Sequence, residues 1–316
     1  MNGATNITDQ WIRKCELFVL SNDETLVLSE FRVTFSVQNA DVDSPNNAAI
    51  RIYNLSKATI NKLTEKSSKF RTVSLNAGYQ NGSYGQIFLG QIKQFRFGKE
   101  DATTVYLDIL AADGDTAYNQ SFVNECLAAG NEKIQTINAI AKKMDLPVDF
   151  GNLKVDLLHT PNIRGKVLFG MGRVLMRNAA SYLDCGWSIQ NGRIQVIPNS
   201  GYLDEQIIEI NSDTGLIGMP EQTDEGIRLK CLLNSKLRIG SLIRIDNALI
   251  NQLDFTGDAP VIYNSYKELQ PLSPLSEDSV YRVFVCEHEG DTRGNQWYTN
   301  LIGLAFDQTN QTTTPT

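Results

Sequence analysis

The sequence predicts a mostly β protein of the α+β class, in which two strand-rich segments flank a small α/β unit. Three observations predict this. Apolar and polar side chains alternate in residues 31–38 and 103–110, which is the period of a half-buried strand. The period changes to that of a helix at 131–147 and returns to two in the last third of the chain. The charge balance also differs between these three parts. The expected units are residues 1–115, 116–200 and 201–307, with a flexible tail at 308–316.

The first unit, residues 1–115, is expected to consist mainly of strands. The apolar run at 86–97 predicts one of them, and the turn-rich residues 78–85, centred on Asn81-Gly82, predict a hairpin before it. One short helix is predicted within 54–66, because Ser56 suits the N-cap position and apolar residues follow at helical spacing.

The middle unit, residues 116–200, is predicted to hold two helices and a hairpin. The first helix is expected to be capped by Asn131, to stop at Pro147 and to bury one face, made of Ile134, Ile137, Ile140, Ala141 and Met144. The second is expected to end at a left-handed Gly186 and to bury Leu175, Ala179, Tyr182 and Leu183. The hairpin at 187–198 is expected to turn at Asn191-Gly192.

The last unit returns to strands, predicted at 227–234, 241–250, 281–290 and 297–306. The proline-containing stretch 267–278 predicts a long exposed loop between two of them. The tail at 308–316 has almost no apolar side chains, so we expect it to be flexible.

Composition and charge exclude several classes of protein. Apolar residues make up 41% and charged residues 21%, as in folded globular proteins. No apolar run reaches the roughly 20 residues of a membrane helix, and the polar N-terminus predicts cytoplasmic synthesis without membrane anchoring. Residues 1–115 carry 12 basic and 13 acidic side chains, residues 116–200 carry 9 and 6, and residues 201–316 carry 8 and 17. The acidic last unit has the wrong sign to hold a nucleic-acid backbone.

Residues 286–300, CEHEGDTRGNQWYTN, are the stretch most suggestive of chemistry. Cys286 and His288 would share one face of a strand and could contribute to a metal site. A catalytic zinc needs three protein ligands, and the only other histidine, His159, lies in the middle unit. The favoured interpretation is a hairpin, in which residues 289–296 turn and Asp291 accepts hydrogen bonds from backbone amides.

Other catalytic and cofactor patterns are weak. The chain has no G-x-S-x-G motif, and pairs such as Asp204/Glu205 or Glu287/Glu289 are expected by chance among 36 acidic residues. The stretch FGMGRVL at 169–175 has Gly170 and Gly172 but no third glycine, so a structural helix start is favoured over a dinucleotide loop. We therefore predict no catalytic residues, no metal and no cofactor. Four basic residues near the two helices are the proposed partner-docking set: Lys142, Lys143, Arg173 and Arg177.

Five strand-and-turn stretches follow one another along the chain. They are AAIRIYNLSKATINKL, VSLNAGYQNGSYGQIFLGQIKQFRF and TTVYLDILAADGD, and later TGLIGMPEQTDEGIRLKCLLNSKLRIGSLIRIDN and YRVFVCEHEGDTRGNQWYTNLIGL. Read in order, from about Phe31 to Leu304, they resemble the first and second barrels of the baseplate hub proteins of contractile-tailed (myovirus-type) bacteriophages. No one motif is diagnostic, but their order and spacing together are specific.

The resemblance implies two β-barrels related to tail-tube subunits, with the α/β unit inserted between them. In some family members the chain completes the first barrel after the insert, which makes residues about 201–228 candidates for that role. It also implies a non-enzymatic virion protein of the tail baseplate, made in the host cytoplasm. The implied partners are two further copies in a homotrimer, a tail tube protein or tube initiator above, a central spike protein below, and other baseplate proteins at the insert. DNA would pass through the central channel without specific binding.

Two rival functions come from other classes. A tail-associated cell-wall hydrolase would need an acid pair or a Cys/His site, which the sequence does not supply. A carbohydrate-binding β module could use Trp11, Trp187 and Trp297 as stacking platforms, although lone tryptophans are more often core or interface residues.

Overall fold

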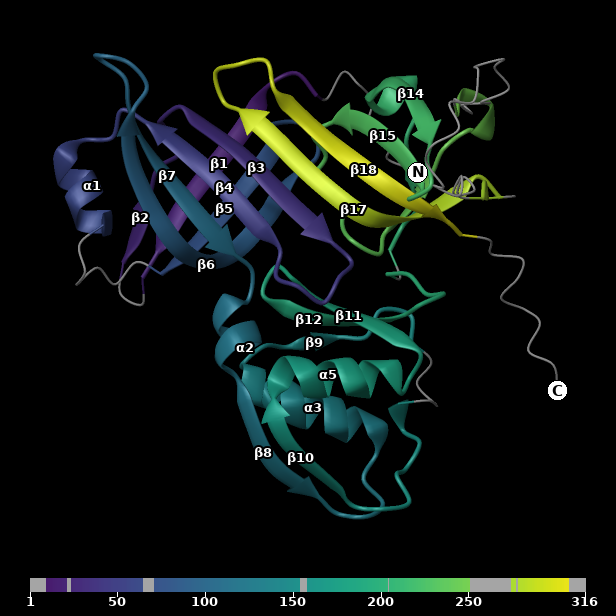
Figure 1. The fold of residues 1–316 in the computed structure, drawn as a ribbon. Coiled ribbons are helices and arrows are strands. Elements are labelled where there is room, and N and C mark those ends of the chain that lie inside the picture. The colour runs from purple at the N-terminus through teal and green to yellow at the C-terminus, as the bar shows by residue number, and fades with distance from the viewer. Residues whose placement is uncertain are drawn as a thin grey trace, which may run out of the picture.

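The fold was obtained as a computed structural model, which describes residues 10–21, 24–64, 71–153, 158–203, 205–250, 274–276 and 278–306. The chain forms a large curved β layer with a smaller α/β unit packed below it (Figure 1). The predicted mostly β class is confirmed. The expected loop at 267–278 and the tail at 308–316 lie largely or wholly outside the described residues.

The first β segment, residues 1–115, forms one end of the large layer, from β3 to β2 along the strand path. Its strands follow from alternating burial, as in β3, where the side chains at alternate positions enter the core. The predicted cap at Ser56 is confirmed, because its hydroxyl accepts a hydrogen bond from the Thr59 amide at 3.1 Å. The elements are β1 (Arg13–Leu20), β2 (Thr25–Val27), β3 (Val33–Ala40), β4 (Asn47–Tyr53), α1 (Lys57–Thr64), β5 (Thr72–Tyr79), β6 (Tyr84–Lys99) and β7 (Val105–Ala112).

The last β segment, residues 201–307, continues the same layer. Its elements are β13 (Ile208–Glu209), η2 (Ser212–Thr214), β14 (Leu216–Gln222), β15 (Ile227–Leu232), β16 (Leu242–Arg244), η3 (Asn247–Leu249), β17 (Val280–Asp291) and β18 (Trp297–Ala305). The strand predicted at 241–250 is shorter than expected, because Asp246 caps a 3₁₀ turn by accepting from the Ala248 amide at 2.9 Å.

A single 13-stranded sheet joins the two segments, because β17 pairs antiparallel with β3. The hydrogen-bonded path is β14-β15-β18-β17-β3-β4-β7-β6-β5-β1-β2, with β13 and β16 beside it. Within the described residues this path does not close on itself. Of the strands in 201–228, β13 pairs with β16 and β14 pairs with β15.

Two large cores lie along this sheet, beside a small cluster of Leu242, Val280 and Phe306. The first core is built from the first β segment, with Leu233 and Trp297 added from the last segment. The second core lies entirely in the last segment and includes Ile227, Tyr281 and Cys286. The unit boundaries inferred from the sequence remain a prediction, but the two cores show where apolar side chains gather.

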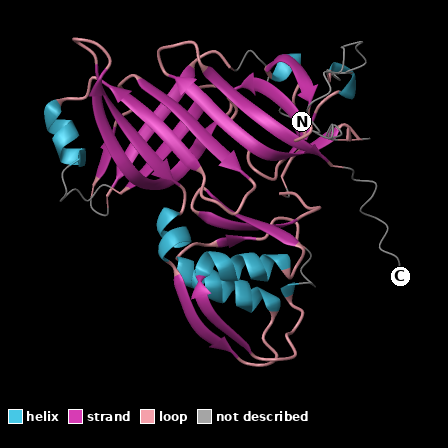
Figure 2. Cartoon of the chain, viewed as in Figure 1, coloured by secondary structure: helices cyan, strands magenta, loops and turns pink. Residues whose placement is uncertain are grey.

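The middle unit, residues 116–200, is called the insert below and has three layers (Figures 1 and 2). The strands β9 (Val148–Asp149), β11 (Cys185–Gln190) and β12 (Arg193–Pro198) face the large sheet. The helices α3 (Lys133–Met144) and α5 (Gly172–Ser181) form the middle layer, with α2 (Asp115–Gln120) at one end. The pair β8 (Phe122–Leu127) and β10 (Lys166–Met171) lies on the far side, and a third core fills the space between the layers.

Three local predictions in the insert were wrong. The N-cap of α3 is Glu132, which forms a capping box with Gln135, because the Asn131 side chain instead donates to the Ala128 carbonyl at 2.5 Å. The left-handed residue after α5 is Asp184 (φ 54°), and Gly186 lies in β11. Tyr182 is the C-cap residue of α5 and is 66% exposed, whereas the next residue, Leu183, is buried. The turn at Asn191-Gly192 is confirmed, with φ of 52° and 75°.

Candidate functional site

Residues 286–300 form the hairpin that the sequence favours. β17 extends to Asp291 and β18 starts at Trp297, so the turn is shorter than predicted and is closed by the Asp291 amide donating to the Gln296 carbonyl at 2.8 Å. Asp291 also accepts from the Arg293 amide at 2.9 Å, which confirms the predicted backbone hydrogen bond.

Cys286 and His288 share one face of β17, as predicted. His288 Nε2 lies 3.4 Å from Cys286 Sγ, and Nδ1 lies 2.9 Å from Thr299 Oγ1. Both side chains are fully buried, and burial lowers the pKa of His288 to about 4 while raising that of the Cys286 thiol well above its usual value. A neutral imidazole beside a protonated thiol is a hydrogen-bonded core pair rather than an activated nucleophile.

Metal ligation finds little support in the geometry. Among the residues that the structure describes, no three His, Cys, Asp or Glu side chains gather closely enough to share an ion. His159 lies between β9 and β10 of the insert, whereas His288 lies in β17. The Nδ1 atom of His159 lies 2.7 Å from Glu132 Oε2 at the start of α3.

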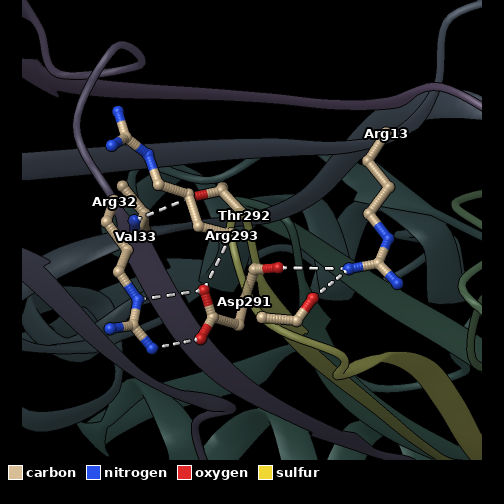
Figure 3. Close-up of polar contacts among 7 residues, drawn as sticks. Arg13, Arg32, Val33, Asp291, Thr292 and Arg293 are labelled. Carbon is tan, nitrogen blue, oxygen red and sulfur yellow. Dashed lines mark hydrogen bonds and ion pairs between the residues drawn. The ribbon is translucent and has the colours of Figure 1, made fainter.

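The tip of the hairpin is anchored to the first β segment (Figure 3). The Asp291 carboxylate receives two hydrogen bonds from Arg32, at 3.3 and 2.7 Å, which together form a bidentate ion pair. These hydrogen bonds hold the pKa of Asp291 below its usual value. The Val33 amide donates to Thr292 Oγ1 at 3.0 Å, and the Thr292 amide donates to the Val33 carbonyl at 3.0 Å, so the same two segments are also joined here.

Arg13 of β1 secures the other side of the tip. Its guanidinium donates to the Gly294 carbonyl at 2.5 Å and lies 5.5 Å from the centre of the Trp297 ring. Trp297 is fully buried and contacts Phe35 edge-on at 5.5 Å between ring centres. The contacts of Arg13, Arg32, Asp291 and Trp297, termed here the hairpin clasp, therefore bind the last β segment to the core of the first.

A second set of polar contacts fixes the insert to both β segments. Arg282 pairs with Asp41 in a buried ion pair and donates to the Asn199 carbonyl at 3.2 Å. Asn46 donates to the Ile189 carbonyl at 3.0 Å. Buried charges with so many partners favour one fixed orientation of the insert.

Asp113 stands where the first segment passes into the insert. Its carboxylate accepts a hydrogen bond from the Gly192 amide at 2.9 Å, at the turn between β11 and β12. Burial raises the pKa of Asp113 to about 7, and the backbone hydrogen bonds from Gly192 and Asn191 offset only part of that rise.

The proposed docking residues occupy two different settings. Lys142 and Lys143 are exposed in the last turn of α3, and no described residue forms a salt bridge with them. Arg173 donates to the Tyr118 carbonyl at 3.0 Å, and Arg177 pairs with Asp43 of the first β segment. The two arginines therefore contribute to contacts within the chain, although Arg177 is also exposed, and Lys142 and Lys143 face solvent without a salt bridge to any described residue.

The remaining sequence candidates take structural positions. Gly172 begins α5 where an added Cβ would lie 2.3 Å from Ser121 Oγ and 2.9 Å from Met144, so this glycine permits close packing. Of the three tryptophans, Trp187 and Trp297 are buried, and Trp11 is 78% exposed. Sequence reasoning missed Arg13 and Arg32, whose partners lie more than 250 residues away along the chain and left no local pattern.

Within the described residues, no helix combines the length and the apolar character that crossing a membrane requires. The comparisons with known proteins give a consistent result. The family model described as Baseplate hub gp41 matches residues 16–256. No curated protein matches the chain.

Several solved structures share the fold. The prophage MuSo2 43 kDa tail protein from Shewanella oneidensis matches with a TM-score of 0.55 and 6% identity, over 92% of this chain and 96% of that chain. A tail protein from Neisseria meningitidis MC58 matches with a TM-score of 0.55 and 8% identity, over 93% and 96%. The Escherichia coli c3393 protein, a component of the type VI secretion system, matches with a TM-score of 0.51 and 9% identity, over 88% and 74%.

Proposed function

Because the chain belongs to the Baseplate hub gp41 family, we propose that it is the ring-forming hub that joins the tail tube to the central spike. Its role as a structural component of a phage tail baseplate follows from the family and agrees with the tail-protein fold. The proposal adds the assembly: three copies in a ring, a hexameric tube above, a trimeric spike below, and a channel for DNA.

The observation that carries the proposal is the open sheet with two cores. In the described part of the chain, β2 and β14 are the end strands of the path and lie at opposite ends of the molecule (Figure 1). A free strand edge carries unpaired backbone groups that another chain can pair with. Contacts between unlike edges of neighbouring copies generate a ring when the rotation closes.

Two β segments per chain would also solve a symmetry mismatch. Three copies present six strand-rich units, each with its own core, while keeping true threefold symmetry. The upper surface of such a ring can match six tube subunits, and the lower surface can match three spike chains. The hairpin clasp supports this arrangement, because it holds the two segments of one chain at a fixed spacing.

The net charge of −7 supports passage of DNA without specific binding, because a channel wall without excess positive charge does not retain phosphates. The exposed Lys142 and Lys143 support docking of the insert to an acidic neighbour in the baseplate.

Cysteines placed at the two free edges would test the ring. In the double variant Val27→Cys and Met219→Cys, oxidation of assembled tails is expected to link hub chains to one another up to trimers, because both positions are exposed on end strands. Each single variant serves as the control and should give no ladder beyond dimers. Hub chains that are present in the tails but never cross-link to each other would contradict the edge-to-edge ring.

A further inference from the structure

The sheet formed by β8 and β10 has an apolar outward face. Its cross-strand neighbours on this face are Phe122 with Met171, Asn124 with Phe169, and Cys126 with Val167. The alternate positions, such as Val123 and Leu168, are buried in the insert core. The strand pair therefore has one face packed within the insert and one face directed outward.

The outward face is a continuous patch rather than a set of scattered residues. Phe122 is 52% exposed, Val167 72% and Phe169 67%. The rings of Phe122 and Phe169 meet edge-on, with centres 5.2 Å apart. Together these side chains expose on the order of 300 Å² of apolar surface, which is near the largest patch of a typical monomer and is often functional.

The position of the patch suits contact with another protein. The strands β8 and β10 that carry it lie on the side of the insert farthest from the large sheet (Figures 1 and 2). The insert is fixed to both β segments by the Arg282–Asp41 pair and by Asn46, so the patch is presented in a defined direction.

The positive charge balance of the insert favours an acidic partner over a second copy of the insert. None of the outward positions of β8 and β10 carries a charge, and the exposed Arg164 lies just before β10. Residues 116–200 carry 9 basic and 6 acidic side chains, so a second insert would bring like charge to the contact.

We propose that the outward face of β8 and β10 binds a different baseplate protein, through an apolar segment of that protein bordered by Asp or Glu side chains. This proposal rests on the proposed hub function and assigns a surface distinct from Lys142 and Lys143. Phe122 and Phe169 would be the central anchors, since buried aromatic side chains supply much of the energy of protein interfaces. Arg164 would face the acidic border.

Photocrosslinking in the assembled phage tail tests the assignment. Phe169 is replaced by p-benzoylphenylalanine in the full-length hub, and Phe97 of β6, which is 54% exposed, is replaced in a matched control. The expected result is a crosslink from position 169, but not from position 97, to a baseplate protein other than the hub, with Asp or Glu beside the crosslinked apolar residues. A crosslink to a second hub chain, or none from position 169, would overturn the proposal.

Cys126 gives a second readout without any substitution. Its side chain is exposed on the same face, so maleimide should label it in the isolated chain and should be excluded from it in the assembled tail. Equal labelling in both states would show that the face stays open and would refute the proposal.

Substitution of the anchors measures their contribution. In tails carrying Phe122→Ser with Phe169→Ser, or Arg164→Glu, the amount of the crosslinked protein per hub chain should fall, by about tenfold or more for the double variant. Phe97→Ser should leave it unchanged. Unchanged amounts in the double variant would contradict the proposal, whereas absence of the wild-type hub from purified tails would instead contradict the hub function itself. If the double variant fails to fold, the photocrosslink from position 169 and the maleimide labelling of Cys126 still test whether this face binds a partner.

Discussion

Burial of Asp113 should make the hub less stable as the pH rises. Its pKa is about 7 in the fold and about 3.9 in an unfolded chain, so between these values the folded chain holds a proton that the unfolded chain has released. The free energy of unfolding therefore falls as the pH rises from about 4 to about 7 and changes no further above that. From pH 5 to pH 8 this single carboxyl is expected to remove about 2.5 kcal/mol.

Asp113→Asn should abolish that loss. The amide oxygen can still accept the hydrogen bond from the Gly192 amide, and no buried charge forms at any pH. In urea unfolding at pH 5 and pH 8, the stability of the variant relative to the wild type should rise by about 2.5 kcal/mol between the two conditions. The comparison between variant and wild type cancels the titration of all other groups.

Asp149→Asn is the matched control, because Asp149 of the insert likewise accepts a hydrogen bond from a backbone amide, that of Gly151 at 3.0 Å, but is exposed. Its stability should follow the wild-type pH dependence. If Asp113→Asn also kept the wild-type dependence, burial of Asp113 as a titrating carboxyl would be refuted.

Three further predictions concern the hairpin clasp, the buried Cys286–His288 pair, and Lys142 with Lys143. Asp291→Ala should lower the free energy of unfolding by about 2–4 kcal/mol, because Arg32 loses two charge-assisted hydrogen bonds. Hydrogen exchange should become faster at residues 291–297. Unchanged exchange there would argue against the clasp. His288→Ala and Cys286→Ala should leave tail assembly largely intact, and elemental analysis of the purified hub should find no stoichiometric zinc; one zinc per chain, or loss of infectivity with the variant incorporated, would show this to be wrong. Lys142→Glu with Lys143→Glu should weaken incorporation into tails without unfolding the isolated chain, and normal incorporation would count against docking through these lysines.

Local signals in the sequence predicted much of the fold. Ser56 caps α1, Asn191-Gly192 turns a hairpin, and residues 281–290 and 297–306 pair, because each depends on neighbours a few residues away. The errors arose where another local arrangement was adopted. The Asn131 side chain bonds to the Ala128 carbonyl three residues before it, so Glu132 caps α3, and Tyr182 is the exposed C-cap residue of α5.

The candidate site was predictable only in part. The sequence indicated a polar hairpin in which Asp291 bonds to the backbone, and the structure agrees. The partners in the clasp could not be predicted, because Arg32 and Asp291 are 259 residues apart and meet only when β17 pairs with β3. The patch on β8 and β10 was also missed, because the sequence reading predicted two helices and one hairpin in residues 116–200 and did not predict these two strands.

The central claim, that the hub adapts sixfold to threefold symmetry, is tested most directly by a reconstruction of the intact tail without imposed symmetry, in which hub copies are counted. The account predicts three copies per baseplate, with the first and the last β segments of each chain alternating in a ring of six. Six copies per baseplate, or three copies that leave either segment outside the ring, would contradict it.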